Sequence, residues 1–176
     1  MHSLLAMAGE RCEECGSDLG NPDVAVAAAD LREMTPGFRA AVTGLSDEAL
    51  RARSAPGVWS LLEYLAHVRD VPRFHGAVIR DALRAEPGSE VRQPPVDIDA
   101  VVADLGYNQE DPTAVLDAVE ANLARFADRI EQLTPEEQAV TLLRVGQTVP
   151  VAFLAGNVLH ETRHHLLDVR RLAAQR

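Results

Sequence analysis

The apolar residues of this chain recur at intervals of three and four positions over most of its length, which is the period of an α-helix. The clearest run lies between residues 112 and 133. Its apolar positions are Val115, Val119, Leu123, Phe126, Ile130 and Leu133. Asp111 is a typical N-cap and Pro112 fits the first helical position, so the pattern predicts a helix that begins there.

The same periodicity predicts three further helical segments. Residues 23–45 form the first, which Pro36-Gly37 should interrupt because proline lacks the backbone N–H that a helix interior needs. A second runs over residues 58–85, with a kink expected at Pro72. The last covers residues 149–173. Four long helices predict an all-α protein, a four-helix bundle, and bundles build metal sites from side chains on facing helices.

The segments between these helices are less regular. Residues 1–22 are expected to be an N-terminal tail that carries a C-x-x-C motif, with the bundle domain over residues 23–176. Residues 87–111 form a long, acidic connection, and connections of this length often line a functional site. Residues 139–147 fit either a short strand or an extended loop.

Composition limits the classes of partner. The formal net charge is −10, which argues against a nucleic-acid partner, because binding to phosphates needs a basic surface. No apolar run approaches the ~20 residues that cross a bilayer, and the first residues lack the basic start of a signal peptide. We therefore expect a cytoplasmic protein that binds neither nucleic acid nor membrane, acts on a small molecule and pairs as a homodimer.

The two cysteines, Cys12 and Cys15, form a C-x-x-C motif. In a cytosolic protein this spacing is typical of half a zinc knuckle or of a redox pair. A second metal ion at this pair would need further ligands, which His2, a nearby acid or a second subunit could supply. The other interpretation is a flexible tail with two free thiols.

A second motif lies near the C-terminus, where residues 160–165 read His-Glu-Thr-Arg-His-His. His160 and His164 are four positions apart, so they share one helix face and can bind a single ion. The string also matches the H-E-x-x-H motif of zinc proteases. The extended protease motif would need Gly and His where this chain has Leu167 and Arg170. A third ligand must then come from upstream, where His67 and His75 are the candidates.

Two motifs together resemble a known family. Trp59-Ser60-x-x-Glu63-x-x-x-His67-x-x-Asp70, followed about 90 residues later by the histidine string, is similar to the DinB-like (YfiT-like) family of four-helix-bundle proteins. The resemblance covers roughly residues 25–174. It implies a divalent ion, zinc or nickel, bound by His67, His160 and His164.

The resemblance also implies a reaction class. Members of this family include metal-dependent hydrolases and S-transferases or isomerases that use a low-molecular-weight thiol. All 17 basic residues of this chain are arginine, a composition typical of GC-rich actinobacterial genomes, which would favour mycothiol as that thiol. The alternative function is a non-catalytic metal-binding or stress-response interaction module.

Several residues around the expected ligands have open roles. Glu63, Asp70 and Asp168 lie one helical turn from a histidine and could each orient an imidazole. Glu161 and His165 are each offset by one residue, or about 100° on a helix, from an expected ligand. Their side chains are therefore expected to point away from the ion, and the sequence assigns no catalytic residue.

Overall fold

The computed structural model describes residues 11–19, 22–86, 89–93 and 95–176. Its helices are α1 (Val24–Met34), α2 (Pro36–Val42), α3 (Asp47–Arg51), α4 (Leu61–Arg84), α5 (Ile98–Asp104), the 3-10 turn η1 (Tyr107–Gln109), α6 (Pro112–Glu131), α7 (Pro135–Ala139) and α8 (Val151–Ala173). Its strands are β1 (Arg92–Gln93), β2 (Thr141–Arg144) and β3 (Gln147–Pro150).

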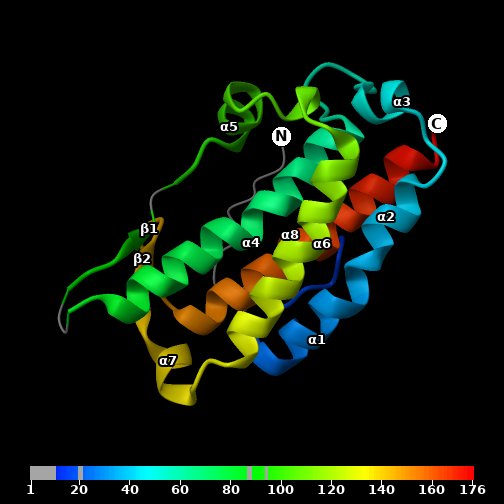
Figure 1. Ribbon diagram of the computed structural model, residues 1–176. Helices are drawn as coiled ribbons and strands as arrows, with labels where there is room; N and C mark the ends of the chain where they lie inside the picture. Colours follow the sequence, from blue (N-terminus) through cyan, green and yellow to red (C-terminus); the bar gives the residue numbers. More distant parts are fainter. Residues whose placement is uncertain (1–10, 20–21, 87–88, 94) are drawn as a thin grey trace.

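Four helices make the bundle, in which α4 packs on both α6 and α8, and α1 packs on the same two helices (Figure 1). The helix α2 continues along α8 beyond the end of α1. Apolar side chains from all four helices fill the space between them and are almost wholly buried. The predicted fold class, a four-helix bundle, is confirmed.

Capping residues decide where the bundle helices begin. Asp111 caps α6 by accepting a hydrogen bond from the backbone N–H of Ala114, as the sequence predicted. The helix α4 begins at Leu61, three residues after the predicted start. Ser60 and Glu63 form a capping box there, in which each side chain accepts a hydrogen bond from the other residue's backbone N–H.

The two prolines that were predicted to interrupt or kink helices, Pro36 and Pro72, behave differently. Pro36 separates α1 from α2, as predicted, and occupies the first position of the second helix. Pro72 stands inside α4, which continues through it to Arg84. Gly37, next to the break, allows α2 to approach α8 closely, because a Cβ atom at this position would lie 3.1 Å from the Leu166 side chain.

A small sheet lies at one end of the bundle. Strands β2 and β3 form an antiparallel hairpin, and β1 pairs with β2 in parallel. Val145 and Gly146 connect the hairpin with positive φ angles of 48° and 83°, as a tight primed turn requires. The ambiguous residues 139–147 thus end α7 and form most of this hairpin. The described part of the connection 87–111 contains β1, α5 and η1.

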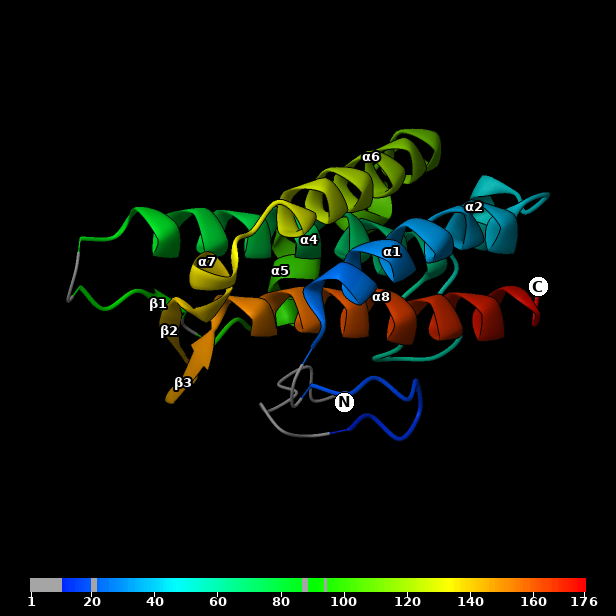
Figure 2. The same cartoon turned by 90° about the horizontal axis from the view of Figure 1, so that it is seen from below.

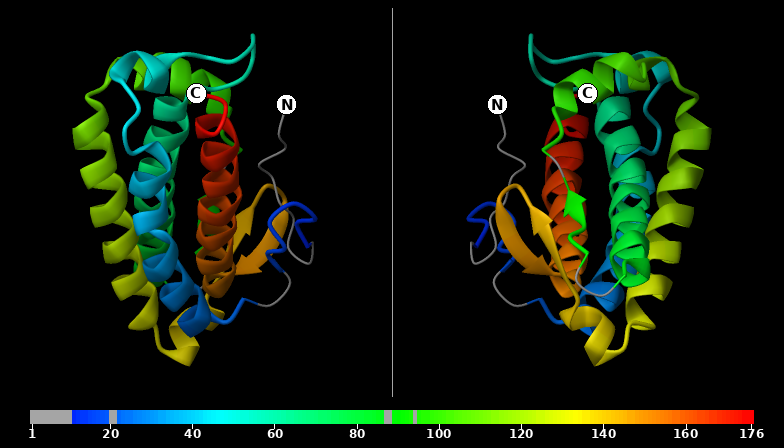
Figure 3. Two further views of the ribbon diagram at one scale, coloured as in Figure 1. Left: turned by 90° about the vertical axis from the view of Figure 1, so that its right-hand side faces the viewer. Right: turned by 90° about the vertical axis from the view of Figure 1, so that its left-hand side faces the viewer.

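Residues 11–19 lie along the outer side of α8, away from α6 (Figures 2 and 3). Their backbone turns back on itself, because the N–H of Cys12 donates to the carbonyl of Ser17 at 2.9 Å and that of Gly16 to the carbonyl of Cys12 at 2.8 Å. Leu19 is only 1% exposed and belongs to the core. This part of the expected tail is therefore packed on the bundle.

The helices of the described part of the chain include none that is both long and apolar enough to span a bilayer.

Burial of α6 should account for a large part of the stability. We expect Leu123→Ala, at a position with no exposed surface, to lower the free energy of unfolding by about 2–5 kcal/mol, because it leaves a cavity between packed helices. Leu105→Ala is the matched control, since Leu105 is 63% exposed and should change stability by less than about 0.5 kcal/mol. Urea titration of both variants measures the difference. Equal losses would contradict this account of the core.

Candidate metal centre

Residues 160–165 of α8 present two pairs of side chains in different directions. His160 and His164 point toward the segment of residues 11–19, and Glu161 and His165 point toward α4. The reason is that consecutive residues on a helix are rotated by about 100°, while residues four apart share a face. Each direction contains a group of side chains that could hold an ion.

The inner group consists of His67 from α4 with Glu161 and His165 from α8, and all three are buried. Glu161 Oε2 lies 3.4 Å from His67 Nε2 and 3.3 Å from His165 Nε2. Bonds of about 2.1 Å from one tetrahedral ion to N and O atoms would separate the ligand atoms by about 3.4 Å. The two measured distances agree with that geometry.

The hydrogen bonds of His165 prepare one of its nitrogens to act as a ligand. Its Nδ1 donates to Asp168 Oδ2 at 3.0 Å, so Nε2 carries the lone pair when the ring is neutral. This Nε2 is buried and makes no hydrogen bond, although it faces Glu161. Metal-bound histidines commonly donate their other N–H to a carboxylate in this way. The residues therefore fit a divalent ion such as zinc.

The charges in the inner group depend on one another. Burial alone would raise the pKa of Glu161, but the imidazoles of His165 and His67 outweigh it and hold that pKa far below its usual range. Burial lowers the pKa of His67, which favours its neutral, metal-binding form. Burial also opposes the charge on His165, but Asp168 and Glu161 outweigh it and raise the pKa of His165.

Aromatic rings border the group. The ring of Trp59 lies 5.3 Å from that of His67, and the ring of Tyr64 lies 5.3 Å from that of His165, centre to centre. The rings of His67 and His165 meet edge to face at 4.9 Å. These contacts restrict rotation of both imidazoles, so the positions of their Nε2 atoms are fixed by packing.

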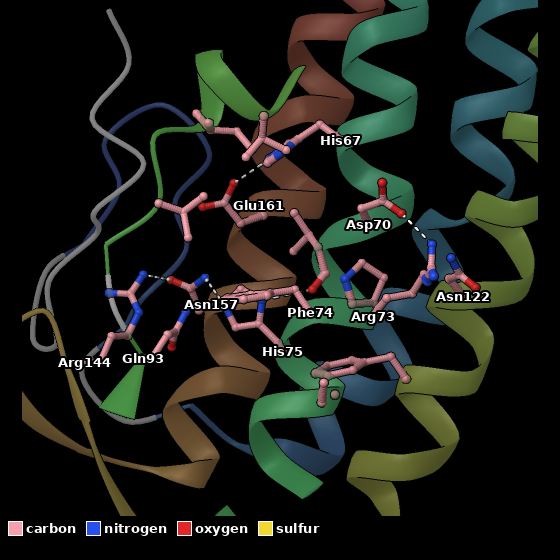
Figure 4. Close-up of a pocket in the computed structure, with 18 of the residues that line it drawn as sticks. His67, Asp70, Arg73, Phe74, His75, Gln93, Asn122, Arg144, Asn157 and Glu161 are labelled. Carbon is pink, nitrogen blue, oxygen red and sulfur yellow. Dashed lines mark hydrogen bonds and ion pairs between the residues drawn. The ribbon is translucent and has the colours of Figure 1, made fainter. Parts of the chain in front are cut away.

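The inner group opens into a cavity of about 1230 Å3, which His67, Asp70 and Glu161 help to line (Figure 4). The cavity lies between α4, α6, α8 and the connection that contains α5. Arginine side chains also line it, namely Arg73, Arg80, Arg125, Arg129 and Arg144. The protein as a whole is acidic, so this concentration of arginine is local; within it, Arg73 pairs with Asp70 and Arg80 with Asp81.

The outer group consists of Cys12, Cys15, His160 and His164. Cys12 Sγ lies 3.6 Å from His164 Nδ1, and Cys15 Sγ lies 3.4 Å from His160 Nδ1. Burial would raise the pKa of Cys15, but hydrogen bonds with His160, His164 and Ser17 outweigh it and lower the pKa to about 4. The hydrogen bond with Cys15 contributes most to raising the pKa of His164 to about 9.

The structure divides the three predicted ligands between these groups. His67 lies with Glu161 and His165, whereas His160 lies with Cys12 and Cys15. His164 faces Cys12 with its Nδ1, and its Nε2 lies near Glu14 and Asp168. The ligand set His67, His160 and His164 stays a prediction, but the geometry favours a different grouping. Glu161 and His165 are also four residues apart, so the sequence contained a second pair on one helix face.

Three further residues that the sequence analysis named, Glu63, Asp70 and His75, form hydrogen bonds or ion pairs outside the inner and outer groups. Glu63 caps α4 and pairs with Arg53, so it stabilises the helix start. Asp70 accepts a hydrogen bond from Tyr107 Oη at 2.8 Å at the cavity wall. His75 uses both ring nitrogens, since Nδ1 donates to the Val71 carbonyl at 2.9 Å and Nε2 accepts from Asn157 at 3.2 Å. His75 therefore offers no lone pair to an ion.

A four-helix bundle with a buried histidine–carboxylate group beside a cavity defines a class of helical proteins with a candidate metal centre. The chain belongs to the DinB superfamily, whose family description matches residues 30–169. Among curated protein sequences, none matches this chain.

Two solved structures share the fold. One is YfiT from Bacillus subtilis, described as a probable metal-dependent hydrolase with an unusual four-helix bundle topology. It is 15% identical with a TM-score of 0.75, over 97% of this chain and 93% of YfiT. The other is a mycothiol-dependent maleylpyruvate isomerase, 16% identical with a TM-score of 0.65, over 84% of this chain and 60% of that one. At these identities the likeness establishes the fold alone.

The imidazole of the buried His75 should stay neutral at mildly acidic pH. Burial lowers its pKa to about 4, below the value of about 6.5 in an unfolded chain, so the unfolded chain takes up this proton first. Its contribution to stability is complete above pH 6.5 and is lost as the pH falls toward 4, at up to about 1.4 kcal/mol per pH unit. NMR titration of the His75 ring should show no protonation between pH 7 and 5. A midpoint near 6.5 would contradict the assigned hydrogen bonds.

Proposed function

We propose that this protein is a metal-dependent enzyme whose divalent ion is bound by His67, Glu161 and His165. The observation that carries the proposal is the buried Glu161 carboxylate, which has an imidazole Nε2 within 3.4 Å on each of two sides. Three protein ligands leave a coordination position for a reactant, as in catalytic metal sites. His67 and Glu161 also line the cavity, so a reactant could approach from there.

The proposed substrate is a small anionic molecule, and the proposed cosubstrate is a low-molecular-weight thiol of the mycothiol type. The arginines of the cavity wall suit carboxylates, because guanidinium groups bind carboxylates through paired hydrogen bonds. A structure with this fold is a mycothiol-dependent isomerase, and another is a probable metal-dependent hydrolase. A reducing cytoplasm, where thiols persist, would be a suitable location.

A bound divalent ion would supply Lewis acidity and would lower the pKa of a thiol or water placed against it. The residues of this chain perform the supporting steps. Asp168 holds the Nδ1 proton of His165, which would leave Nε2, on the side of Glu161, to bind the ion. Trp59 and Tyr64 pack on the imidazoles and restrict their rotation. The arginines would bind and orient the anionic groups of the substrate.

The ligand set can be tested by comparing neighbouring residues of α8. We expect Glu161→Gln, His165→Ala and His67→Ala each to remove one ion per chain and to abolish metal-dependent turnover. Elemental analysis measures the ion, and an assay with mycothiol and a panel of unsaturated carboxylic acids measures turnover. His160→Ala is the control and should retain turnover. If His160→Ala abolishes turnover while Glu161→Gln retains it, the ligand set is wrong.

The same assay, extended to esters and amides, separates an enzyme from a non-catalytic module. Turnover that requires both the ion and the thiol supports the proposal. Ester or amide hydrolysis without thiol would make the protein a hydrolase and overturn the proposed cosubstrate. A metal-loaded protein that is inert toward thiols, esters and amides would overturn the enzyme and favour a metal-binding interaction module.

The contact between Asp168 and His165 gives a further prediction. Asp168→Asn should lower the affinity of the inner group for zinc by about 10- to 100-fold, because the amide no longer favours the proton on Nδ1 of His165. Competition with a fluorescent zinc chelator measures this affinity. Asp128→Asn is a matched control, since the exposed Asp128 pairs with Arg32 at 2.8 Å, away from the inner group. Equal affinities for Asp168→Asn and the wild type would contradict the assigned role.

A further inference from the structure

We infer that Cys12, Cys15, His160 and His164 form a second, structural zinc site that fastens the N-terminal segment to α8. The site is separate from the inner group of His67, Glu161 and His165, and it does not depend on the proposed enzymatic function. It would explain why two histidines of α8 face away from the bundle core toward a pair of cysteines.

The residue types and spacings match those of closed zinc sites. Zinc sites with two cysteines and two histidines place the cysteines two to four residues apart and the histidines three to five residues apart. Here two residues separate Cys12 from Cys15, and three separate His160 from His164. Two thiolates would balance the charge of Zn2+, and four protein ligands would leave no position for a substrate.

The distances agree with a tetrahedral ion. A Zn–S bond of about 2.3 Å and a Zn–N bond of about 2.1 Å place S and N about 3.6 Å apart. The measured separations are 3.6 Å from Cys12 Sγ to His164 Nδ1 and 3.4 Å from Cys15 Sγ to His160 Nδ1. The ligand atoms of Cys12, Cys15 and His160 lie within 4.8 Å of one another, and His164 joins them through Cys12 Sγ.

The backbone of residues 11–18 is shaped to present both cysteines to α8. The chain turns tightly after Cys12, and Gly16 adopts a left-handed φ of 73° that a residue with a side chain rarely takes up. A bridge between Arg11 and Asp18 closes the loop. Arg163 then donates to Ser17 Oγ at 3.3 Å and pairs with Asp30 at 2.8 Å, which joins this loop, α8 and α1.

Carboxylates also lie beside the second ring nitrogen of His164. His164 directs Nδ1 toward Cys12, while its Nε2 lies 3.6 Å from Glu14 and 3.8 Å from Asp168. A carboxylate beside the second ring nitrogen is the usual arrangement for a zinc-bound histidine. Asp168 also bonds to His165 of the inner group, so the two groups share this carboxylate. Zinc at the outer group would hold residues 11–18 against α8.

Cobalt spectroscopy tests the site in the full chain. Co2+ bound by thiolates gives an intense charge-transfer band in the near ultraviolet, which an ion held by His67, Glu161 and His165 cannot give. We expect the band in wild-type protein and in His67→Ala, where the inner group is broken. The Cys12→Ser/Cys15→Ser variant should lose this charge-transfer band and should bind one zinc ion fewer per chain than the wild type. That variant should retain the ion of the inner group if the proposed enzyme site is correct.

Three results would overturn the inference. The first is wild-type protein that binds cobalt without the thiolate band. The second is an unchanged zinc content in Cys12→Ser/Cys15→Ser. The third concerns wild-type protein purified without reductant and then treated with a zinc chelator. If its two cysteines do not react with a thiol reagent, they form a disulfide and are not zinc ligands. Since wild-type protein alone gives the first and third results, misfolding of a variant would not affect the decision.

Discussion

The central physical constraint of this structure is the burial of the Glu161 carboxylate in the middle of the bundle. An isolated charge in such a place costs several kcal/mol, so it must be paired or bind a metal. His67 of α4 and His165 of α8 lie on two sides of it. Both imidazoles are themselves packed against aromatic rings, which leaves little freedom for α4 to slide or rotate against α8.

The position of the buried Glu161 group places the candidate metal site next to the cavity. The buried group lies where α4 and α8 meet, and the cavity begins on the side of His67 and Glu161. The long connection after α4 supplies α5 and η1, and Tyr107 of η1 bonds to Asp70 at the cavity wall. The bundle therefore provides a packed group of candidate metal ligands, while a less regular segment shapes the space beside it. This division is common, since variable loops on a fixed scaffold often determine specificity.

The two groups on α8 show how one helix can serve two purposes. Residues 160 and 164 face the cysteines, and residues 161 and 165 face α4, because a shift of one residue turns the side chain by about 100°. The inner group has three protein ligands beside a cavity, which suits catalysis. The outer group has four candidate ligands, which would leave no position for a substrate, and this suits a structural role.

The sequence by itself determined the helical bundle, the start of α6 at Asp111, the break at Pro36 and the importance of residues 160–165, because these depend on local periodicity, capping and composition. Only the tertiary structure decided which histidines lie together. Both pairs on α8 have the same spacing, so the sequence could not tell which pair faces His67. The rotation of α8 about its axis decides that, and it is set by packing against α1, α4 and residues 11–19.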